Sequence, residues 1–458
     1  MVRGGIIIPT ANPDGPDIID AAAACAFERQ RRGGSLKITK IETIRVEAVP
    51  NSEWQRANPQ TRQASPGNLW VRIYTDAGLV GLGETYYVPR AVSAVIHDTY
   101  APLLIGRDPL DIENHWNNMF SLANFFGYAG AEMRAISAID IALWDLAGQH
   151  TGQPIYNLLG GRNRDRVPVY NTCVGSGKYN DFAAWSGGHA GDLARDLLAQ
   201  GIKAMKVWPF DQFGWTLTGP TNPRGKMTVL GQDTPAGVQT HYLSQDELKQ
   251  GVAVVEDIRR AVGDKMAIAV EGHARYDLPT AVRIARALEP LDIMWLEEIM
   301  PPDSPEAFVR LKAATRVPIC QSERVFTRYN FRQFIERNAA DIIMPDLSWC
   351  GGITEARKIS AFADTYYLPI TTHDCVGPVA MWAAAHLMLH IPNAMIAEIV
   401  RGYVYGWYND VVTDQIKLED GLLSLNGKPG LGVALRDEFV KSNQCRVETS
   451  TEDRLLMW

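Results

Sequence analysis

Five short apolar runs between residues 266 and 373 each end on side chains that can take part in chemistry. These side chains are Glu271 with His273, then Glu297, Glu323, Asp346 and His373. The steps of roughly 25 residues match one strand, one helix and two loops of a (β/α) barrel. Because the carboxyl ends of all barrel strands meet at one mouth, we expect these side chains to form a single site.

Glu271, Glu297 and Glu323 are predicted to bind a metal ion. Three carboxylates at one barrel mouth cannot all stay ionised without a cation beside them. Hard oxygen ligands that leave room for water and substrate suit Mg²⁺. Such an ion also stabilises the second negative charge that builds up when a proton is removed α to a carboxylate. The adjacent Glu298 alternates to the other side of its strand, so we expect it outside the metal ligands.

Asp346 and His373 end successive predicted strands. The Asp346 carboxylate can therefore hold one tautomer of the His373 imidazole and raise its pKa. His273 follows Glu271 by two residues, and strand alternation predicts that both side chains lie on the same side. The sequence thus predicts two imidazoles beside three carboxylates.

The elements that must position these residues fall into four segments. Residues 1–36 form an extension rich in Gly, Ala and Arg, and residues 37–165 combine three strands with a run of helices, as in an α+β domain. Within that domain a hairpin is predicted to turn at residues 76–78. Residues 166–400 alternate strands and helices and predict a TIM barrel of (β/α)7β type, whereas residues 401–458 contain no further strand–helix unit.

Two long polar segments interrupt this regular pattern. Residues 209–243 form an insertion rich in aromatic residues, Gly and Pro, which is predicted to project onto the catalytic face as a pocket wall, a subunit contact or a neutral excursion. The loop before the predicted hairpin carries Arg56 and Arg62. These two arginines, and Arg224 in the insertion, either meet a distal substrate carboxylate or are solvated.

The composition of the chain indicates which partners it is expected to lack and in which compartment it is expected to lie. At 458 residues, with 46% hydrophobic and 21% charged residues, the chain suits a barrel plus a second domain in a soluble globular protein. A net charge of −7 gives no reason to expect nucleic acid or an anionic membrane as a partner. The six cysteines form no CxxC pair, and no apolar run reaches transmembrane length or resembles a signal peptide. We therefore expect reduced thiols and a cytoplasmic location.

Several motifs, in order between about Lys37 and Asp437, resemble the mandelate racemase subgroup of the enolase superfamily. They are GLVGLGE, AIDIALWDLAG, PIYNLLGG, WLEE, the strand ends at Asp346 and His373, and PGLGV. The resemblance implies a capping domain, built from both ends of the chain, that covers the barrel mouth and sets substrate choice. It also implies a His or Lys base with Mg²⁺ beside an ene-diolate, and a homo-oligomer, either a dimer or an octamer.

The resemblance also assigns roles to individual residues. Asp346 and His373 would form the general base that takes the α-proton. Glu398, at the end of the eighth predicted strand, resembles the acidic residue that hydrogen-bonds the enediolate oxygen. One departure is Glu271, because the family usually has Asp at this position of the third strand. The longer side chain would move the ion or change its coordination.

The second barrel strand distinguishes members of this subgroup. Racemases resembling this chain carry Lys-x-Lys there, with the second lysine acting as a base on the opposite face of the substrate. Here the aligned residues are Lys206, Val207 and Trp208, so tryptophan replaces that second lysine. Lys206 can still neutralise the substrate carboxylate, whereas Lys203 lies too early in the strand. A racemisation with two bases is therefore disfavoured.

His273 indicates the class of reaction. Its spacing from Glu271 resembles the acidic-x-His pattern of acid-sugar dehydratases like galactonate dehydratase, where this histidine is the general acid that protonates the departing β-hydroxyl. Alternatively, His273 is only a hydrogen-bond partner of a metal ligand. The resemblance implies a Mg²⁺-dependent hydro-lyase that converts a small-molecule aldonate or aldarate into a 2-keto-3-deoxy acid. The alternatives are a cycloisomerase or epimerase of an anhydro or lactone sugar acid, and a non-catalytic metal-binding relative.

Overall fold

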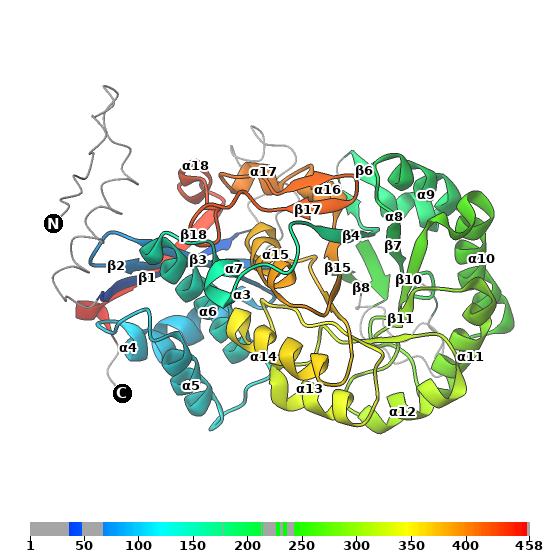
Figure 1. The fold of residues 1–458 in the computed structure, drawn as a ribbon, viewed down its shortest axis with the longest axis horizontal. Coiled ribbons are helices and arrows are strands. Elements are labelled where there is room, and N and C mark those ends of the chain that lie inside the picture. Colours follow the sequence, from blue (N-terminus) through cyan, green and yellow to red (C-terminus); the bar gives the residue numbers. More distant parts are fainter. Residues whose placement is uncertain are drawn as a thin grey trace, which may run out of the picture.

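The computed structural model has a sheet domain at one end and a barrel at the other (Figure 1). It describes residues 36–47, 67–176, 178–211, 213 and 242–455, and the backbone of residues 226–229 and 232–235. Most of the predicted N-terminal extension and of the 209–243 insertion lies outside these residues. Arg56, Arg62 and Arg224, considered above as anion-binding residues, also lie outside them.

Both ends of the chain contribute to the sheet of the capping domain (Figure 1). Its antiparallel strands lie in the order β18, β1, β2, β3. They are β1 (Ile38–Val46), β2 (Asn68–Thr75), β3 (Val80–Tyr86) and β18 (Cys445–Thr451). The predicted turn joins β2 to β3, where Gly78 adopts a φ of 79° and donates its N–H to Thr75 O. The predicted capping domain built from both ends of the chain is confirmed, because β18 pairs along β1.

A run of helices packs against this sheet. These helices are α3 (Pro89–Ala94), the π-helical η2 (Val95–Tyr100), α4 (Ala101–Leu104), α5 (Ile112–Ala123), α6 (Ala131–Thr151) and α7 (Ile155–Leu159). The long helix α6 lies directly on β3, because Gly81 and Gly83 leave no side chain between the two backbones. A methyl group at Gly83 would overlap the carbonyl oxygen of Ala138. The GLVGLGE motif is thus a packing surface for α6.

Eight parallel strands close into the predicted barrel. They are β4 (Val167–Thr172), β7 (Ala204–Val207), β10 (Ala267–Glu271), β11 (Trp295–Glu297), β12 (Ile319–Gln321), β13 (Ile342–Ile343), β14 (Ile370–Thr372) and β15 (Ala394–Ile399). Pairing between β15 and β4 completes the ring. The helices between them are α8 (Asp181–Ser186), α9 (Ala190–Ala199), α10 (Gln245–Val262), α11 (Leu278–Leu288), α12 (Pro305–Ala314), α13 (Thr327–Glu336), α14 (Gly352–Asp364) and α15 (Pro378–His390). The (β/α)7β prediction is confirmed.

Strand alternation decides which side chains enter the barrel. Along β7, Met205 and Val207 belong to the large core around the barrel, whereas Ala204 belongs to a separate inner cluster. Lys206, two residues after Ala204, is therefore directed into the barrel, and Glu271 and Glu297 follow the same pattern on their strands. Small inner residues such as Ala204 and Ala269 leave room for these long side chains.

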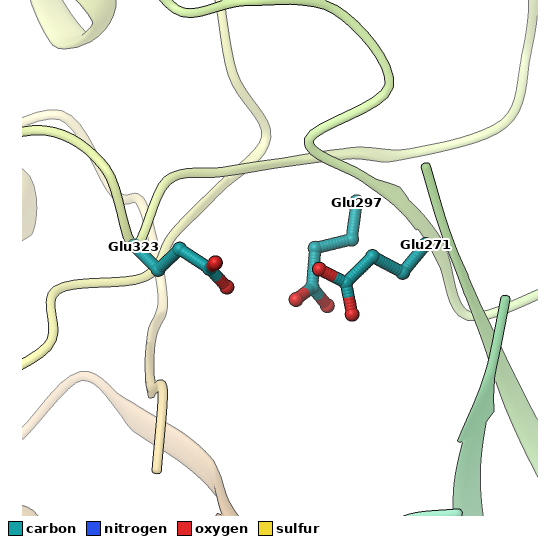
Figure 2. A group of neighbouring side chains, drawn as sticks. All are labelled: Glu271, Glu297 and Glu323. Carbon is teal, nitrogen blue, oxygen red and sulfur yellow. The ribbon is translucent and has the colours of Figure 1, made fainter. Parts of the chain in front are cut away.

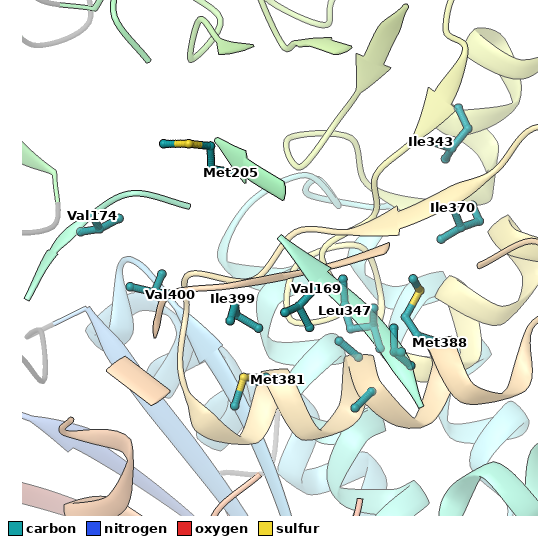
Figure 3. Close-up of a cluster of buried hydrophobic side chains, with 14 of the residues drawn as sticks. Val169, Val174, Met205, Ile343, Leu347, Ile370, Met381, Met388, Ile399 and Val400 are labelled. Atoms are coloured by element: carbon teal, nitrogen blue, oxygen red, sulfur yellow. The ribbon is translucent and has the colours of Figure 1, made fainter. Parts of the chain in front are cut away.

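Figure 3 shows aliphatic and methionine side chains from the large core outside the barrel strands. Ile343, Ile370 and Ile399 from three strands lie in one cluster with Met381 and Met388 of α15. Complete burial of each such side chain contributes about 2 kcal/mol. Helix α15 is buried along almost its whole length, because it packs against β15 of the barrel and β3 of the capping domain. This explains why its sequence is apolar on every face.

Short elements complete the described structure. They are β5 (Gly175–Ser176), β6 (Tyr179–Asn180), β8 (Lys226–Val229), β9 (Gln232–Pro235), β16 (Lys417–Glu419), β17 (Leu422–Ser424), η3 (Gly263–Lys265), η4 (Glu289–Leu291), η5 (Glu452–Arg454), α16 (Arg401–Val404), α17 (Tyr408–Val411) and α18 (Asp437–Val440). The hairpin of β16 and β17, which the sequence did not indicate, pairs antiparallel with β4. Within the described part of the chain, no helix combines the length and apolar character needed to cross a membrane.

Candidate active site

The three predicted metal ligands meet at the barrel mouth (Figure 2). Glu271 and Glu297 are the last residues of β10 and β11, and one carboxylate oxygen from each lies within 4.8 Å of one from Glu323. Glu323 approaches the other two from the opposite side (Figure 2). Its strand β12 ends at Gln321, two residues earlier than the sequence pattern suggested. All three side chains are buried.

Two of these buried carboxylates, Glu297 and Glu323, differ in their pKa values. Burial raises the pKa of Glu297 to about 8, because a desolvated carboxylate is costly. Burial also disfavours the charged form of Glu323, but the positive charges of His373 and Arg324 outweigh it and lower the pKa of Glu323 to about 2. The site therefore holds concentrated negative charge that needs cationic partners.

Lys206 supplies part of that positive charge. Its Nζ lies 3.0 Å from Glu271 Oε2, 2.6 Å from Glu297 Oε1 and 2.7 Å from Glu398 Oε1. Burial alone would lower the pKa of this ammonium, but the three carboxylates raise it well above the ordinary lysine value. Lys206 is thus a permanent cation inside the barrel, at the position where the sequence placed it.

Asp346 and His373 form the expected pair. His373 Nδ1 lies 2.6 Å from Asp346 Oδ2, and the other oxygen of Asp346 accepts hydrogen bonds from the Ser348 N–H and hydroxyl. Because a carboxylate only accepts, Nδ1 carries the proton and Nε2 is directed toward Glu323, 3.2 Å away. Burial opposes charging of this ring, yet the neighbouring charges, led by Glu323, raise the pKa of His373 well above its usual range.

His273 lies at the opposite end of the triad. Its Nε2 is 3.1 Å from Glu271 Oε1, and its Nδ1 hydrogen-bonds the carboxylate of Asp211. Burial lowers the pKa of the His273 ring, but Glu271 and Asp211 together raise it to about 9. His273 lies beside Glu271, as predicted, but strand alternation does not place it there. Strand β10 ends at Glu271, and a left-handed backbone at His273, with φ of 45°, directs the ring toward Glu271.

Glu398 and Glu298 have different environments. The Glu398 carboxylate lies inside the barrel. Its Oε2 accepts the Asp374 N–H at 2.8 Å, and its Oε1 contacts Lys206. Burial disfavours its charge, but Lys206 and His373 lower the pKa of Glu398. The carboxylate of Glu298 instead binds the Ser322 hydroxyl and the Arg324 guanidinium. Glu298 is therefore not part of the close carboxylate group.

The capping domain holds the loops that carry the Asp346–His373 pair. Glu84 of β3 accepts the N–H groups of Val379 and Ala380 at the start of α15, a few residues beyond His373. Asn68 donates to Val376 O on the same loop. The hydroxyl of Thr85 donates to Ser348 O beside Asp346. The position of the pair therefore depends on both domains.

The donor set fits a hard divalent cation. Three buried carboxylates converge, and Glu271 Oε1 is buried without a hydrogen bond of good geometry among the described residues. Carboxylate oxygens are the ligands that Mg²⁺ prefers. The same carboxylates raise the pKa values of both imidazoles, so a cation among them would favour the neutral His373 that a base requires.

Sequence reasoning missed two side chains next to the imidazoles. Asp211 lies four residues after β7 and binds His273, and the Trp349 ring centroid lies 5.0 Å from that of His373. Trp349 also lies 4.3 Å below the guanidinium of Arg134, which comes from α6 of the capping domain. The one feature of the sequence that could have indicated them is their position, since both residues follow a barrel strand. Neither belongs to a motif that marks its role.

Comparison with known proteins agrees with this geometry. Residues 189–439 match the family described as enolase C-terminal domain-like, and residues 40–160 match the mandelate racemase / muconate lactonizing enzyme N-terminal domain. A D-xylonate dehydratase from Haloferax volcanii is 30% identical over 425 residues, covering 91% of this chain and 92% of that protein. A D-galactonate dehydratase from Variovorax paradoxus is 32% identical over 416 residues, covering 88% and 94%.

Solved structures give the same result. An enolase of the mandelate racemase subgroup from Agrobacterium tumefaciens is 36% identical and superposes with a TM-score of 0.76, covering 92% of this chain and all of that one. Both family matches, the closed barrel with its cap and the buried carboxylates are therefore mutually consistent. The chain belongs to the mandelate racemase subgroup of the enolase superfamily.

Proposed function

We propose that this enzyme is a hydro-lyase that removes water from a sugar acid, an aldonate or an aldarate, and releases a 2-keto-3-deoxy acid. The observation that carries the proposal is the placement of the two imidazoles at opposite ends of the carboxylate triad. His273 Nε2 contacts Glu271 and His373 Nε2 contacts Glu323. A substrate between them would meet a base on one side and an acid on the other, as β-elimination requires. The dehydratases among its relatives support the same reaction.

In this reaction, His373 would accept the C2 proton on Nε2, because Asp346 holds Nδ1. The electron pair left at C2 would form the C2–C3 double bond as the C3–O bond breaks. The departing hydroxide would take a proton from His273 Nε2 and leave as water. The enol product would then gain a proton at C3, which gives the 2-keto-3-deoxy acid.

The remaining residues of the site would bind the charged groups of the substrate and the metal ion. Lys206 would neutralise the substrate carboxylate, and Glu398 would accept a hydrogen bond from the enediol hydroxyl. Glu271, Glu297 and Glu323 are the proposed ligands of Mg²⁺. When bound, this ion would stabilise the negative charge that develops on the substrate carboxylate after proton removal.

We further propose the molecular context of this activity. The chain would divide into an extension (1–36), a capping domain (37–165), a catalytic barrel (166–400) and a returning segment (401–458). Its partner would be a small sugar acid, rather than nucleic acid or a membrane. The enzyme would act in the cytoplasm as a homo-oligomer, either a dimer or an octamer.

A screen of aldonates and aldarates with Mg²⁺ tests the proposed reaction. The 2-keto-3-deoxy product is read by absorbance of its semicarbazone, and exchange of the C2 proton is read by NMR in D₂O. His373→Asn should abolish both exchange and water loss, whereas His273→Asn should abolish water loss alone. Turnover with deuterium at C2 but no keto-deoxy product would instead favour the epimerase or cycloisomerase.

A further inference from the structure

Asp211 is a buried acid beside the proposed general acid. It follows β7 by four residues and is 4% exposed. Of the described residues, His273 is the one whose side chain hydrogen-bonds the Asp211 carboxylate, through Nδ1. The second oxygen, Oδ1, is buried and accepts no hydrogen bond from the described part of the chain. The pair thus resembles the Asp346–His373 pair in chemistry, but it lies at the opposite end of the carboxylate triad.

The backbone around Asp211 is anchored to the loop that carries His273. The Arg275 guanidinium donates to the main-chain oxygen of Asp211, and the Tyr276 hydroxyl donates to Phe210 O at 2.7 Å. Both donors lie within three residues of His273. The segment that carries Asp211 and the segment that carries His273 are therefore joined by two further hydrogen bonds. These bonds limit how far the His273 ring can rotate.

Packing fixes Asp211 from the outer side as well. The Phe210 ring lies against Gly251 of α10, where a methyl group would overlap the ring. The Trp208 and His273 rings are nearly perpendicular, with a centroid distance of 5.6 Å. The segment 208–211 thus supplies both a wall and a hydrogen-bond acceptor for one imidazole. Trp208 replaces the lysine found at this position in the racemases that the sequence resembles.

We propose that Asp211 is the positioning residue for His273 and thereby directs the reaction toward water loss. The inference rests on the proposed function. By accepting Nδ1–H, Asp211 leaves Nε2 as the atom that faces substrate. In the elimination step the C3–O bond breaks, the Nε2 proton passes to the leaving hydroxide, and water departs. Nδ1–H stays with Asp211, so His273 ends the step as the neutral tautomer that the carboxylate holds.

If Asp211 has this role, its removal should change the rate of water loss but not the rate of C2 proton exchange. Both rates can be measured in one sample. Removal of the C2 proton depends on His373, which does not contact Asp211, whereas loss of the β-hydroxyl depends on His273. In Asp211→Ala we expect water loss to slow by about 10²-fold. Exchange of the C2 proton should stay near the wild-type rate. Asp211→Asn, whose amide oxygen can still accept Nδ1–H, should restore part of the lost rate.

The experiment uses full-length enzyme with Mg²⁺ in D₂O, with D-xylonate and D-galactonate as first probes and then the sugar-acid library. Proton NMR follows deuterium entry into recovered substrate and formation of the keto-deoxy acid. Asp257→Ala is the matched control, because the Asp257 carboxylate likewise accepts a hydrogen bond from another element, the Gly191 N–H at 2.7 Å, but lies on the outer helix α10. Its ratio of exchange to water loss should equal that of wild type.

The outcomes separate this inference from the proposed function. A raised ratio of C2 exchange to water loss in Asp211→Ala supports the positioning role, provided that adding Asp211→Ala to His273→Asn leaves both rates as they are in His273→Asn alone. Equal slowing of exchange and water loss would make Asp211 merely structural, and wild-type water loss would overturn its role altogether. If wild-type enzyme dehydrates no sugar acid, the proposed function fails and this inference fails with it.

Discussion

The side chain of Lys206 shows how one residue balances a buried acidic site. Its ammonium contacts three carboxylates, and both partners in each pair are almost completely buried. Removing a single partner from a buried ion pair leaves uncompensated charge, which is more costly than losing a surface contact. Two of the proposed metal ligands, Glu271 and Glu297, therefore form one electrostatic unit with Lys206 and Glu398.

Replacement of Lys206 by Met should lower the free energy of unfolding by about 3–5 kcal/mol in EDTA. Mg²⁺ should then raise the melting temperature more than it does in wild type, because the ion restores positive charge. Thermal unfolding with and without Mg²⁺ checks both effects. Lys358→Met, which removes a partly exposed pair with Glu113, is the control and should cost less than about 1 kcal/mol. An unchanged stability of Lys206→Met in EDTA would contradict this account.

At the scale of single elements, β3 is both a packing surface for α6 and an anchor for the start of α15. Its glycines allow α6 to lie against the strand, and its Glu84 reaches the first N–H groups of α15. An acidic side chain at a helix N-terminus satisfies donors that have no partner within the helix. One short strand thus connects the cap to the loop that carries His373.

Gly83→Ala should lower the free energy of unfolding by about 3 kcal/mol, because the new methyl group meets the backbone of α6 rather than a movable side chain. Chemical denaturation measures this loss. Gly78→Asn is a suitable control, since space around Gly78 is open and Asn tolerates its positive φ. Equal stability of the Gly83→Ala variant and wild type would show that β3 and α6 can separate at little cost.

Glu84→Ala should slow exchange of the C2 proton by about 10-fold, because the loop after His373 loses two of its hydrogen bonds. Its free energy of unfolding should fall by about 2 kcal/mol. Glu84→Gln keeps an oxygen that can accept both N–H groups, so it should retain most of the exchange rate. Deuterium exchange at C2 and denaturant unfolding of the two variants test the role of this strand in placing the base. A similar loss of exchange in both variants would implicate the charge rather than the hydrogen bonds.

At the scale of the whole molecule, distant parts of the chain meet at polar residues between the domains. Asp145 of α6 accepts N–H groups from Leu82 in β3 and from Leu431 in the returning C-terminal segment. His386 of α15 accepts the Tyr156 N–H on Nδ1 and contacts Leu431 O, 3.0 Å from Nε2. The motifs AIDIALWDLAG, PIYNLLGG and PGLGV thus meet at this junction.

The bonding of His386 requires a neutral ring, and burial lowers its pKa to about 4, below the ordinary value of 6.5. Between these values the unfolded chain binds more protons than the folded chain. Stability should therefore fall as pH drops from about 6.5 to 4, by about 3 kcal/mol from this group, and should not fall further below pH 4. Glu84, Asp140 and Asp145, with raised pKa values, contribute the opposite slope.

The difference between wild type and His386→Gln isolates the histidine contribution. Because Gln does not titrate, the stability advantage of wild type should shrink as pH falls through this range. Denaturant unfolding of both proteins at several pH values provides the test. Parallel pH curves for the two proteins would show that His386 does not couple the domain junction to pH.

The sequence by itself determined the barrel and brought most of the proposed site residues to its mouth. Even spacing of Glu271, Glu297 and Glu323 was sufficient, because every unit of a (β/α) barrel brings its strand end to the same mouth. Lys206 was identified in another way, through the resemblance of Lys206, Val207 and Trp208 to a Lys-x-Lys pattern. Local periodicity predicts such features well, since neighbouring residues decide them.

Only the tertiary structure decided how these residues are held. His273 faces Glu271 through a left-handed backbone after the strand has ended, not through alternation. Asp211, Trp349 and Glu84 reach the two imidazoles or their loops from other units of the chain. Sequence periodicity contains no information about such contacts, because they depend on loop paths and on how the cap packs against the barrel. The residues proposed to react were thus predicted from spacing and from the resemblance, whereas the residues that hold them required the folded molecule.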